Sequence, residues 1–284
     1  MVSPVSILTC RERRLPLATP CVMGILNVTP DSFSDGGRFV RDGCTDIEAA
    51  VAAAVAMVEA GAALIDVGGE STRPGALPVE EAQELRRVIP IVERLVAIGT
   101  IVSVDTSKPG VARAAIEAGA HLINDVRALT DPGVLRAVEA SDVAVCLMHM
   151  QGEPPTMQKA PHYENVVLEV RAYLGERAAR CRDAGIDRER IVIDPGFGFG
   201  KTLDHNLALL RGLSELTDLG YPVLVGLSRK GMIGTITGRA ADARVAGGLA
   251  AAVVAVQNGA KIVRTHDVAA TVDALKMVSR IMEV

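Results

Sequence analysis

Short runs of valine, isoleucine and leucine recur along the chain, each followed by polar or glycine residues and then by an alanine-rich segment. Within each run the apolar residues are continuous rather than alternating, which indicates strands buried on both faces, as in a parallel sheet. The pattern predicts strands at Val22–Leu26, Ala63–Val67, Ile101–Val104, His121–Ile123, Ala144–Met148, Ile191–Ile193, Pro222–Gly226 and Lys261–Val263.

The segments between these runs are amphipathic, and several begin with Asp, Asn or Pro and run into Gly, as capped helices do. Helices are predicted at Asp46–Ala60, Glu80–Ala97, Pro109–Ala118, Asp131–Ala140, Asn165–Ala184, Asp204–Leu216, Asp242–Asn258 and Val268–Met282. Eight strand–helix units in about 250 residues match a closed (β/α)8 barrel. An open doubly wound sheet is the alternative, but it requires a glycine-rich turn after its first strand, where this chain reads Asn27-Val28-Thr29-Pro30. The pattern therefore favours a (β/α)8 TIM barrel.

The strand–helix pattern keeps the same character throughout the 284 residues. It therefore favours one domain, although that length also allows two small ones. Residues before Pro20 lie outside the repeat and alternate weakly between apolar and polar. We expect residues 1–20 to form a hairpin-like extension that covers the bottom of the barrel, and residues 21–284 to form the barrel. The alanine-rich segment Asp242–Asn258 is a candidate dimer face.

Charge and composition exclude several classes of partner. The chain has 30 basic and 34 acidic side chains and a net charge of -4, whereas nucleic-acid and membrane-surface proteins need clustered Lys and Arg. Its longest strongly apolar stretch, Val245–Val256, is shorter than the ~20 residues that cross a bilayer. The five cysteines form no CxxC pair, which indicates free thiols and a reducing compartment. We expect a cytoplasmic protein without nucleic-acid or membrane partners.

Polar side chains follow every predicted strand, at the end where the active site of such a barrel lies. Each one alone has a structural explanation, as a helix cap, a turn residue or a satisfied core histidine. The opposite ends of the strands show no such pattern, so the number of these residues favours a site. They are Asn27, Glu70 to Arg73, Asp105, Asn124 and Asp125, His149, Asp194, Ser228 to Lys230, and Arg264 to His266.

The residue types at these strand ends indicate a mixed site. Buried Asp105 and Asp194, with the Asn124 amide, suit a planar heterocycle that offers adjacent N–H donors. Ser228 is predicted to open a helix after the seventh strand, whose free N–H groups favour an anion. Cationic donors, several of them where such barrels often hold phosphate, are supplied by Arg73, Lys230, Arg264 and His266.

Other familiar motifs fail. Residues 196–202 (GFGFGKT) look like a phosphate loop, but the leading Gly of that motif falls on Pro195, and Lys201 replaces the third Gly of a dinucleotide fingerprint. No Ser-His-Asp set or metal-type histidine spacing is evident, and we interpret His121, His162 and His205 as structural or exposed.

The four phenylalanines, Phe33, Phe39, Phe197 and Phe199, all fall in predicted loops and none in the predicted core. Two interpretations stay open for these loops: they act as lids that cover the site, or they only fold back on the barrel rim.

At these residues the chain closely resembles the bacterial dihydropteroate synthase family. The first twenty residues and the C-terminal tail match poorly. The matching motifs are Met23–Asp35 (MGILNVTPDSFSD), Asp66–Gly75 (DVGGESTRPG), Ser103–Lys108 (SVDTSK), Asn124–Asp125, Met148–Met150, Asp194–Gly200 (DPGFGFG), Gly226–Lys230 (GLSRK) and Arg264–Asp267 (RTHD).

The resemblance implies an enzyme that joins p-aminobenzoate to 6-hydroxymethyl-7,8-dihydropterin diphosphate, that is inhibited by sulfonamides and that forms a homodimer. It implies that Asn27 helps bind Mg2+ with the diphosphate. The catalytic residues it implies are Asp105, Asp194, Lys230, Arg264 and His266. The pterin would be held by Asp105, Asn124, Asp194 and Lys230, and the anion by Arg73, Arg264 and His266. Near the aminobenzoate it implies Thr72, Pro74 and Ser228, and as further substrate contacts Val126, Met148, Phe199 and Gly226.

Two alternatives remain open from the sequence. A corrinoid-dependent methyltransferase acting on methyltetrahydrofolate is also a pterin-binding barrel, but it has no use for a diphosphate site at Arg73, Arg264 and His266. A binding or regulatory paralogue without turnover would not need the complete set of site residues.

Overall fold

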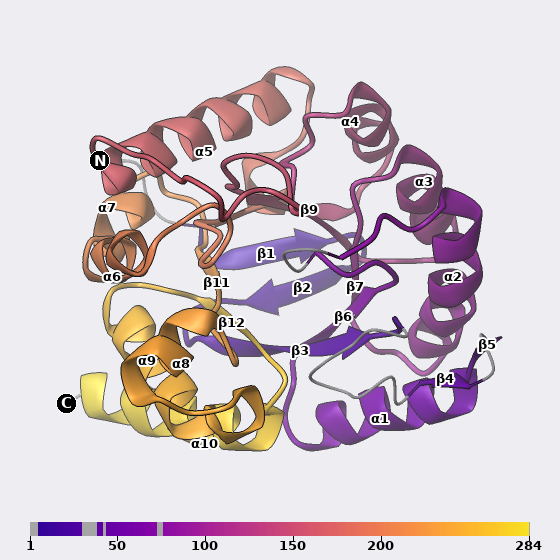
Figure 1. Ribbon diagram of the computed structural model, residues 1–284. Helices are drawn as coiled ribbons and strands as arrows, with labels where there is room; N and C mark the ends of the chain where they lie inside the picture. The colour runs from indigo at the N-terminus through magenta and orange to yellow at the C-terminus, as the bar shows by residue number, and fades with distance from the viewer. Residues whose placement is uncertain (1–4, 30–38, 42–43, 73–75, 284) are drawn as a thin grey trace.

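Eight parallel strands form the centre of the molecule, and helices surround them (Figure 1). The computed structural model describes residues 5–29, 39–41, 44–72 and 76–283. The strands follow the order β10-β9-β8-β7-β6-β3-β12-β11, and a bridge between Ile193 and Val223 joins the two ends into a barrel. The TIM-barrel prediction is confirmed. The barrel strands are β3 (Cys21–Asn27), β6 (Leu64–Gly68), β7 (Val102–Asp105), β8 (Leu122–Asp125), β9 (Ala144–Met148), β10 (Ile191–Asp194), β11 (Leu224–Gly226) and β12 (Ile262–Thr265). A further short pair, β4 (Val40–Arg41) and β5 (Cys44–Thr45), precedes the first helix.

The helices form the outer layer, and several begin where side-chain caps were expected. Asp46 accepts a hydrogen bond from the backbone N–H of Ala49, and Asn165 accepts from those of Val167 and Leu168. Such caps satisfy amide groups that have no partner inside the helix. The helices are α1 (Ile47–Glu59), α2 (Glu81–Ala97), α3 (Pro109–Glu117), α4 (Pro132–Glu139), α5 (Val166–Asp183), α6 (Leu203–Arg211), α7 (Leu213–Thr217), α8 (Gly231–Thr237), α9 (Val245–Gln257) and α10 (Val268–Met282), with 3-10 turns at Arg188–Arg190 and Ala241–Ala243.

The structure corrects two helix predictions. The segment predicted as one helix over residues 204–216 is two helices, α6 and α7, separated at Gly212. A Cβ at Gly212 would lie 2.9 Å from Val167, so α5 packs closely against this break. The short helix α8 was absent from the predicted ranges, because two of its seven residues are glycine and it has no amphipathic period.

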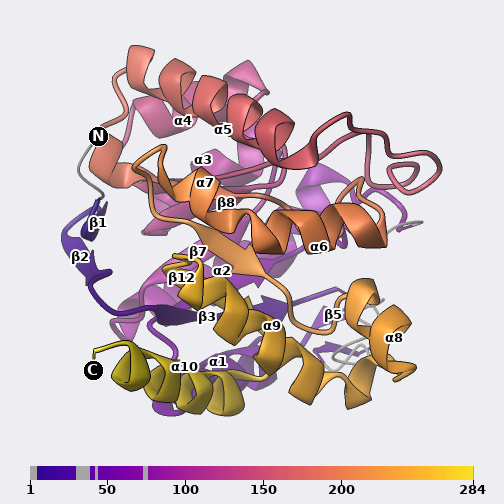
Figure 2. The same cartoon turned by 90° about the vertical axis from the view of Figure 1, so that its left-hand side faces the viewer.

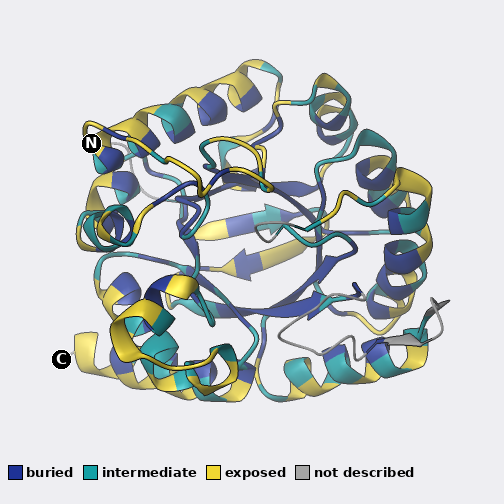
Figure 3. Ribbon diagram, in the orientation of Figure 1, coloured by how far each residue is buried: buried dark blue, intermediate teal, exposed yellow. Residues whose placement is uncertain are grey.

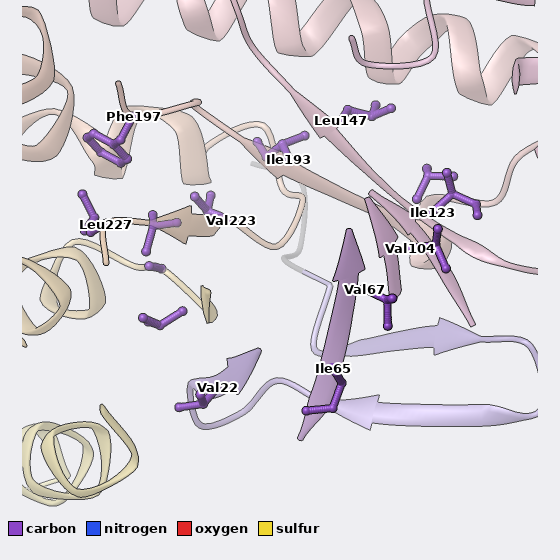
Figure 4. Packing of buried hydrophobic residues seen from close by; sticks show 14 of the residues in the cluster. Val22, Ile65, Val67, Val104, Ile123, Leu147, Ile193, Phe197, Val223 and Leu227 are labelled. Carbon is purple, nitrogen blue, oxygen red and sulfur yellow. The ribbon is translucent and has the colours of Figure 1, made fainter. Parts of the chain in front are cut away.

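Residues alternate along each strand between the barrel interior and the helix layer. Side chains such as Ile65, Val104 and Ile193 pack outward against the helices (Figure 4), while Leu64, Leu122 and others fill the interior. Figure 3 shows the barrel strands buried and the helices exposed on their outer sides. Because both faces are covered, the strands read as continuous apolar runs.

An N-terminal hairpin lies across one end of the barrel. Strands β1 (Ile7–Cys10) and β2 (Arg13–Pro16) pair antiparallel, and the turned view places them at the end opposite α8 (Figure 2). The apolar side chains of this segment join one cluster with inward residues of the strands, namely Leu8, Cys10, Leu15 and Leu17 with Met23, Leu64, Leu122, Ala144, Cys146, Val192, Leu224 and Ile262. This contact leaves the carboxyl ends of the strands as the open face.

The expectation that no phenylalanine belongs to the core was wrong for two of the four. Phe39 and Phe197 are 4% and 1% exposed and belong to the main hydrophobic cluster. Their rings are buried because removing an aromatic ring from solvent is favourable. Phe33 lies outside the described residues.

Within the described part of the chain, no helix is both long enough and apolar enough to span a membrane. Cys10, Cys21, Cys146 and Cys181 are free thiols, as expected, and Cys10, Cys146 and Cys181 are buried.

Candidate active site

The barrel interior is polar at the carboxyl ends of the strands. The strand alternation that points Leu64 and Leu122 inward points Asp66 and Asn124 inward two residues later. Strand register brings these positions together, because Asp66 lies opposite Ser103, and Asp105 lies opposite Asn124. Predicted site residues that are far apart in sequence therefore meet at one end of the barrel.

Arg264 on β12 is held between two carboxylates. Its Nε donates to Oδ2 of Asp66 at 2.6 Å, and its Nη2 donates to Oδ2 of Asp105 at 2.9 Å. Burial disfavours the guanidinium charge, but the two carboxylates outweigh this effect and raise the pKa of Arg264. Arg264 is therefore a fixed cation whose plane is set by its partners rather than by solvent.

Asp66 is fully buried and accepts further hydrogen bonds. The Ser103 hydroxyl donates to its Oδ1 at 2.5 Å, and the Asn124 side-chain amide donates to its Oδ2 at 3.1 Å. No role was predicted for Asp66 from the sequence. The available signal was a lone carboxylate at an inward position of an otherwise apolar strand, since a buried charge requires a partner.

Asp194 and Lys230 form the opposite side of the site. The backbone N–H of Gly196 donates to Oδ1 of Asp194 at 2.7 Å. The Lys230 ammonium lies 4.3 Å from the centre of the Phe199 ring, within the range of a cation–π contact. Burial raises the pKa of Asp194, opposed by the Gly196 hydrogen bond and by nearby cations.

Burial also raises the pKa of Asp105, to about 7. Arg264 opposes this shift, while repulsion from Asp66, Glu84 and Asp125 adds to it. Two carboxylates share one guanidinium here, so protonating one of them is favourable. Asp105 is therefore protonated more readily than an ordinary aspartate.

A pocket opens between these groups at the carboxyl ends of the strands. It encloses about 340 Å³, including its open mouth. It is lined by Thr72, Asp105, Asn124, Val126, Met148, Asp194, Gly196, Phe197, Phe199, Gly226, Lys230 and Arg264. All of these except Gly196 and Phe197 were predicted as substrate contacts.

The remaining predicted residues lie beside this pocket or outside the described chain. Ser228 and His266 pair with each other, with Oγ and Nδ1 3.0 Å apart. Ser228 was predicted to open a helix, and this prediction was wrong. Helix α8 begins at Gly231, and Lys230 is its N-cap. Arg73 and Pro74 lie outside the described residues.

Charged residues anchor the start of the loop after β6. The Lys108 ammonium contacts the carboxylates of Glu70 and Glu84, and Arg87 donates to the carbonyl of Gly69 at 2.8 Å. These contacts tie the loop to α2 and to the loop after β7. They fix the chain leading to Thr72, which lines the pocket.

Asn27 ends β3 next to this site. In strand register it lies opposite Gly68, which lies opposite Asp105. The described residues contain no group of three or more His, Cys, Asp or Glu side chains able to hold a metal ion. Asn27 would supply a single oxygen ligand, a donor set that fits Mg2+ held chiefly by substrate phosphates and water.

Comparisons with known proteins agree with this geometry. The family described as pterin binding enzyme matches residues 23–266. The dihydropteroate synthase of Escherichia coli (strain K12) is 52% identical over 265 residues, covering 93% of this chain and 92% of that protein. The Yersinia pestis dihydropteroate synthase, solved in a sulfonamide drug complex, has a TM-score of 0.94 and 48% identity over 98% of this chain and 100% of that one. The Xanthomonas albilineans dihydropteroate synthase, solved with 4-aminobenzoic acid, has a TM-score of 0.90 and 54% identity, with 100% of both chains covered.

The fold and the pocket are thus those of a pterin-binding barrel enzyme. Within that class the chain belongs to the dihydropteroate synthase family, transferases of folate biosynthesis, and the resemblance seen in the sequence motifs is confirmed.

Proposed function

We propose that this pocket joins p-aminobenzoate to 6-hydroxymethyl-7,8-dihydropterin diphosphate, giving 7,8-dihydropteroate and diphosphate. The observation that carries the proposal is the convergence of Asp105, Asn124, Asp194, Lys230 and Arg264 on one pocket. Carboxylates and an amide match the adjacent N–H groups of a pterin ring, and the cations match a departing anion.

A diphosphate-release assay tests this function. Release should require both substrates together, and a sulfonamide should compete with p-aminobenzoate. Binding of the pterin without turnover would instead identify a non-catalytic paralogue. Methyl transfer from methyltetrahydrofolate to a corrinoid would identify the other alternative, for which the named relatives offer no support.

An arylamine is a neutral, weak nucleophile. The reaction therefore depends mainly on the departure of the leaving group. The carbon–oxygen bond at the pterin methylene breaks, and the diphosphate leaves with the electron pair. Asp105 and Asp194 stabilise the electron-poor pterin that develops. The amine nitrogen then forms the new bond to the methylene carbon and loses its proton to solvent, so no strong general base is required.

Cations would assist the departing diphosphate. We propose Arg73, Arg264 and His266 as its protein partners, although Arg264 already uses Nε and Nη2 on carboxylates. We further propose that Asn27 holds one position of a Mg2+ ion that arrives with the diphosphate. When bound, such an ion neutralises charge on the leaving oxygen. Thr72, Pro74 and Ser228 are proposed to lie near the aminobenzoate.

We predict an acidic limb in the pH profile of kcat/KM. The ionised form of Asp105 accepts the pterin N–H donors, and its pKa is raised to about 7. Protonation as the pH falls below about 7 removes this acceptor, so kcat/KM should drop by nearly tenfold per pH unit. The residual activity of Asp105→Asn should lack this limb. A wild-type profile that stays flat between pH 5 and pH 8 would contradict the assignment.

We also propose a homodimer formed through the late helices. Apolar side chains on α8, α9 and α10 are exposed, namely Ile236, Val254, Met277, Ile281 and Met282. Such side chains on neighbouring helices mark an interaction surface. Sedimentation should give twice the monomer mass for wild type, and Met277→Glu should shift it toward monomer. The exposed variant Leu77→Glu should leave the mass unchanged, and a monomeric wild type would refute the dimer.

The free thiols support the expected cytoplasmic location.

A further inference from the structure

Lys201 follows the glycine-rich loop after β10, in the segment that resembles a phosphate loop but fails the motif. Its side chain is 3% exposed and does not line the pocket. Its ammonium turns back into the loop, with Nζ 3.0 Å from the carbonyl oxygens of Gly196 and Phe199 and 2.9 Å from Nδ1 of His149. Burial lowers the pKa of Lys201 to about 7, and its protonated form has three N–H donors for these three close acceptors. A lysine in this position binds the loop itself instead of a phosphate.

His149 is suited to accept from Lys201 rather than to carry charge. Burial lowers the pKa of His149 to about 3, so that its ring is neutral and a nitrogen lone pair is available. The ring is also packed edge-on against Tyr173, with centroids 5.0 Å apart. The histidine that follows β9 is therefore part of the support behind the pocket, and this role explains why it stands at a strand end without lining the site.

The loop that Lys201 holds has little freedom to choose another path. Gly196, Gly198 and Gly200 have φ values of +67°, +80° and +60°, which favour glycine. A Cβ at Gly196 would lie 1.9 Å from the carbonyl oxygen of His149, and one at Gly200 would lie 2.2 Å from that of Gln151. The backbone therefore lies directly on residues 149–151. Glycines permit this path, and hydrogen bonds hold it: Asn206 accepts from the Gly198 N–H, Tyr163 donates to the Gly200 carbonyl, and Lys201 donates to two further carbonyls of the loop.

The same loop orients the pterin side of the pocket. The Gly196 N–H fixes Asp194, and the Phe199 ring lies under the Lys230 ammonium. A Cβ at Gly198 would lie 3.3 Å from Cδ of Lys230, so the Lys230 side chain runs along the loop backbone. The positions of a carboxylate, a cation and an aromatic ring thus depend on one short loop.

We propose that Lys201, with His149, is a positioning residue for the pterin substrate: it holds the 196–200 loop as a rigid wall and so fixes Asp194, Phe199 and Lys230. It does not touch the substrate. This inference rests on the proposed function, because the rigid loop can affect pterin affinity only if the pocket binds a pterin.

The test is Lys201→Met, which keeps the length of the side chain and removes its donors. Wild type and variant are compared in pterin binding, with 6-hydroxymethylpterin as the probe in a fluorescence titration, and in steady-state kinetics. The Kd for the pterin and the KM for the pterin diphosphate should rise by about 10- to 100-fold. The KM for p-aminobenzoate should change less than about threefold, since the residues proposed near that substrate lie on other loops. The matched control is Lys261→Met, because Lys261 lies at the opposite end of the barrel, directly before β12.

A second variant keeps the proposal testable if Lys201→Met folds poorly. His149→Phe removes one acceptor of Lys201 and should weaken pterin binding in the same direction by a smaller factor. In the double variant the loss should not exceed that of Lys201→Met alone, because both act through one contact. Unchanged pterin affinity in either folded single variant, or an equal rise in both KM values, would overturn the proposal. Failure of wild type to release diphosphate would count against the proposed function instead.

Discussion

Asp66→Ala should lower the free energy of unfolding by about 3 kcal/mol. Asp66 is fully buried and accepts from Arg264, Ser103 and Asn124. Its removal leaves these donors without their acceptor, and a buried cation loses one of two carboxylates. We place the loss at the lower end of the range for breaking a buried ion pair because Asp105 remains bound to Arg264. Urea unfolding of the purified variant measures the change.

A surface ion pair provides the contrast for this prediction. Asp142 pairs with Arg11 at 3.3 Å, but its side chain is 70% exposed. Asp142→Ala should therefore change the free energy of unfolding by less than about 1 kcal/mol. Asp66→Asn, which retains an oxygen acceptor, should fall between the two. If Asp66→Ala were as stable as Asp142→Ala, Asp66 would not be the anchor of the polar layer.

Asp194→Asn should lower kcat/KM for the pterin diphosphate by about 10- to 150-fold, equivalent to a charge-assisted hydrogen bond of about 1.5–3 kcal/mol. One oxygen of Asp194 is already fixed by the Gly196 N–H. An asparagine can keep that bond, but it then presents an amide donor where the carboxylate presented an acceptor. The pterin N–H groups would face a donor in place of a negative charge. Steady-state kinetics with p-aminobenzoate held at saturation measure the loss.

The control for Asp194→Asn is Asp183→Asn, an exposed substitution at the last residue of α5. It should leave kcat/KM unchanged. The thermal transition of Asp194→Asn should stay close to that of wild type, because the variant has the same shape and keeps the Gly196 contact. Undiminished kcat/KM in Asp194→Asn would show that this carboxylate does not bind the pterin.

The sequence alone determined much of the architecture. Each barrel strand was predicted within about two residues of its observed bounds, because burial on both faces produces a continuous apolar run that is visible without any tertiary information. Helix starts at Asp46 and Asn165 were also visible, since a cap is a local hydrogen bond. The convergence of strand-end residues on one face followed from the barrel topology, and most of the predicted substrate contacts do line one pocket.

Only the tertiary structure decided which side chains pair. Arg264 and Asp66 are 198 positions apart, and their contact depends on strand register around the closed barrel. The inward turn of Lys201 depends on His149, an acceptor from a different loop, and the burial of Phe39 and Phe197 depends on their packing against the main hydrophobic cluster. Residue periodicity along a strand or helix reports which face is buried. Periodicity does not identify the residue that packs against that face, because long-range packing determines this neighbour.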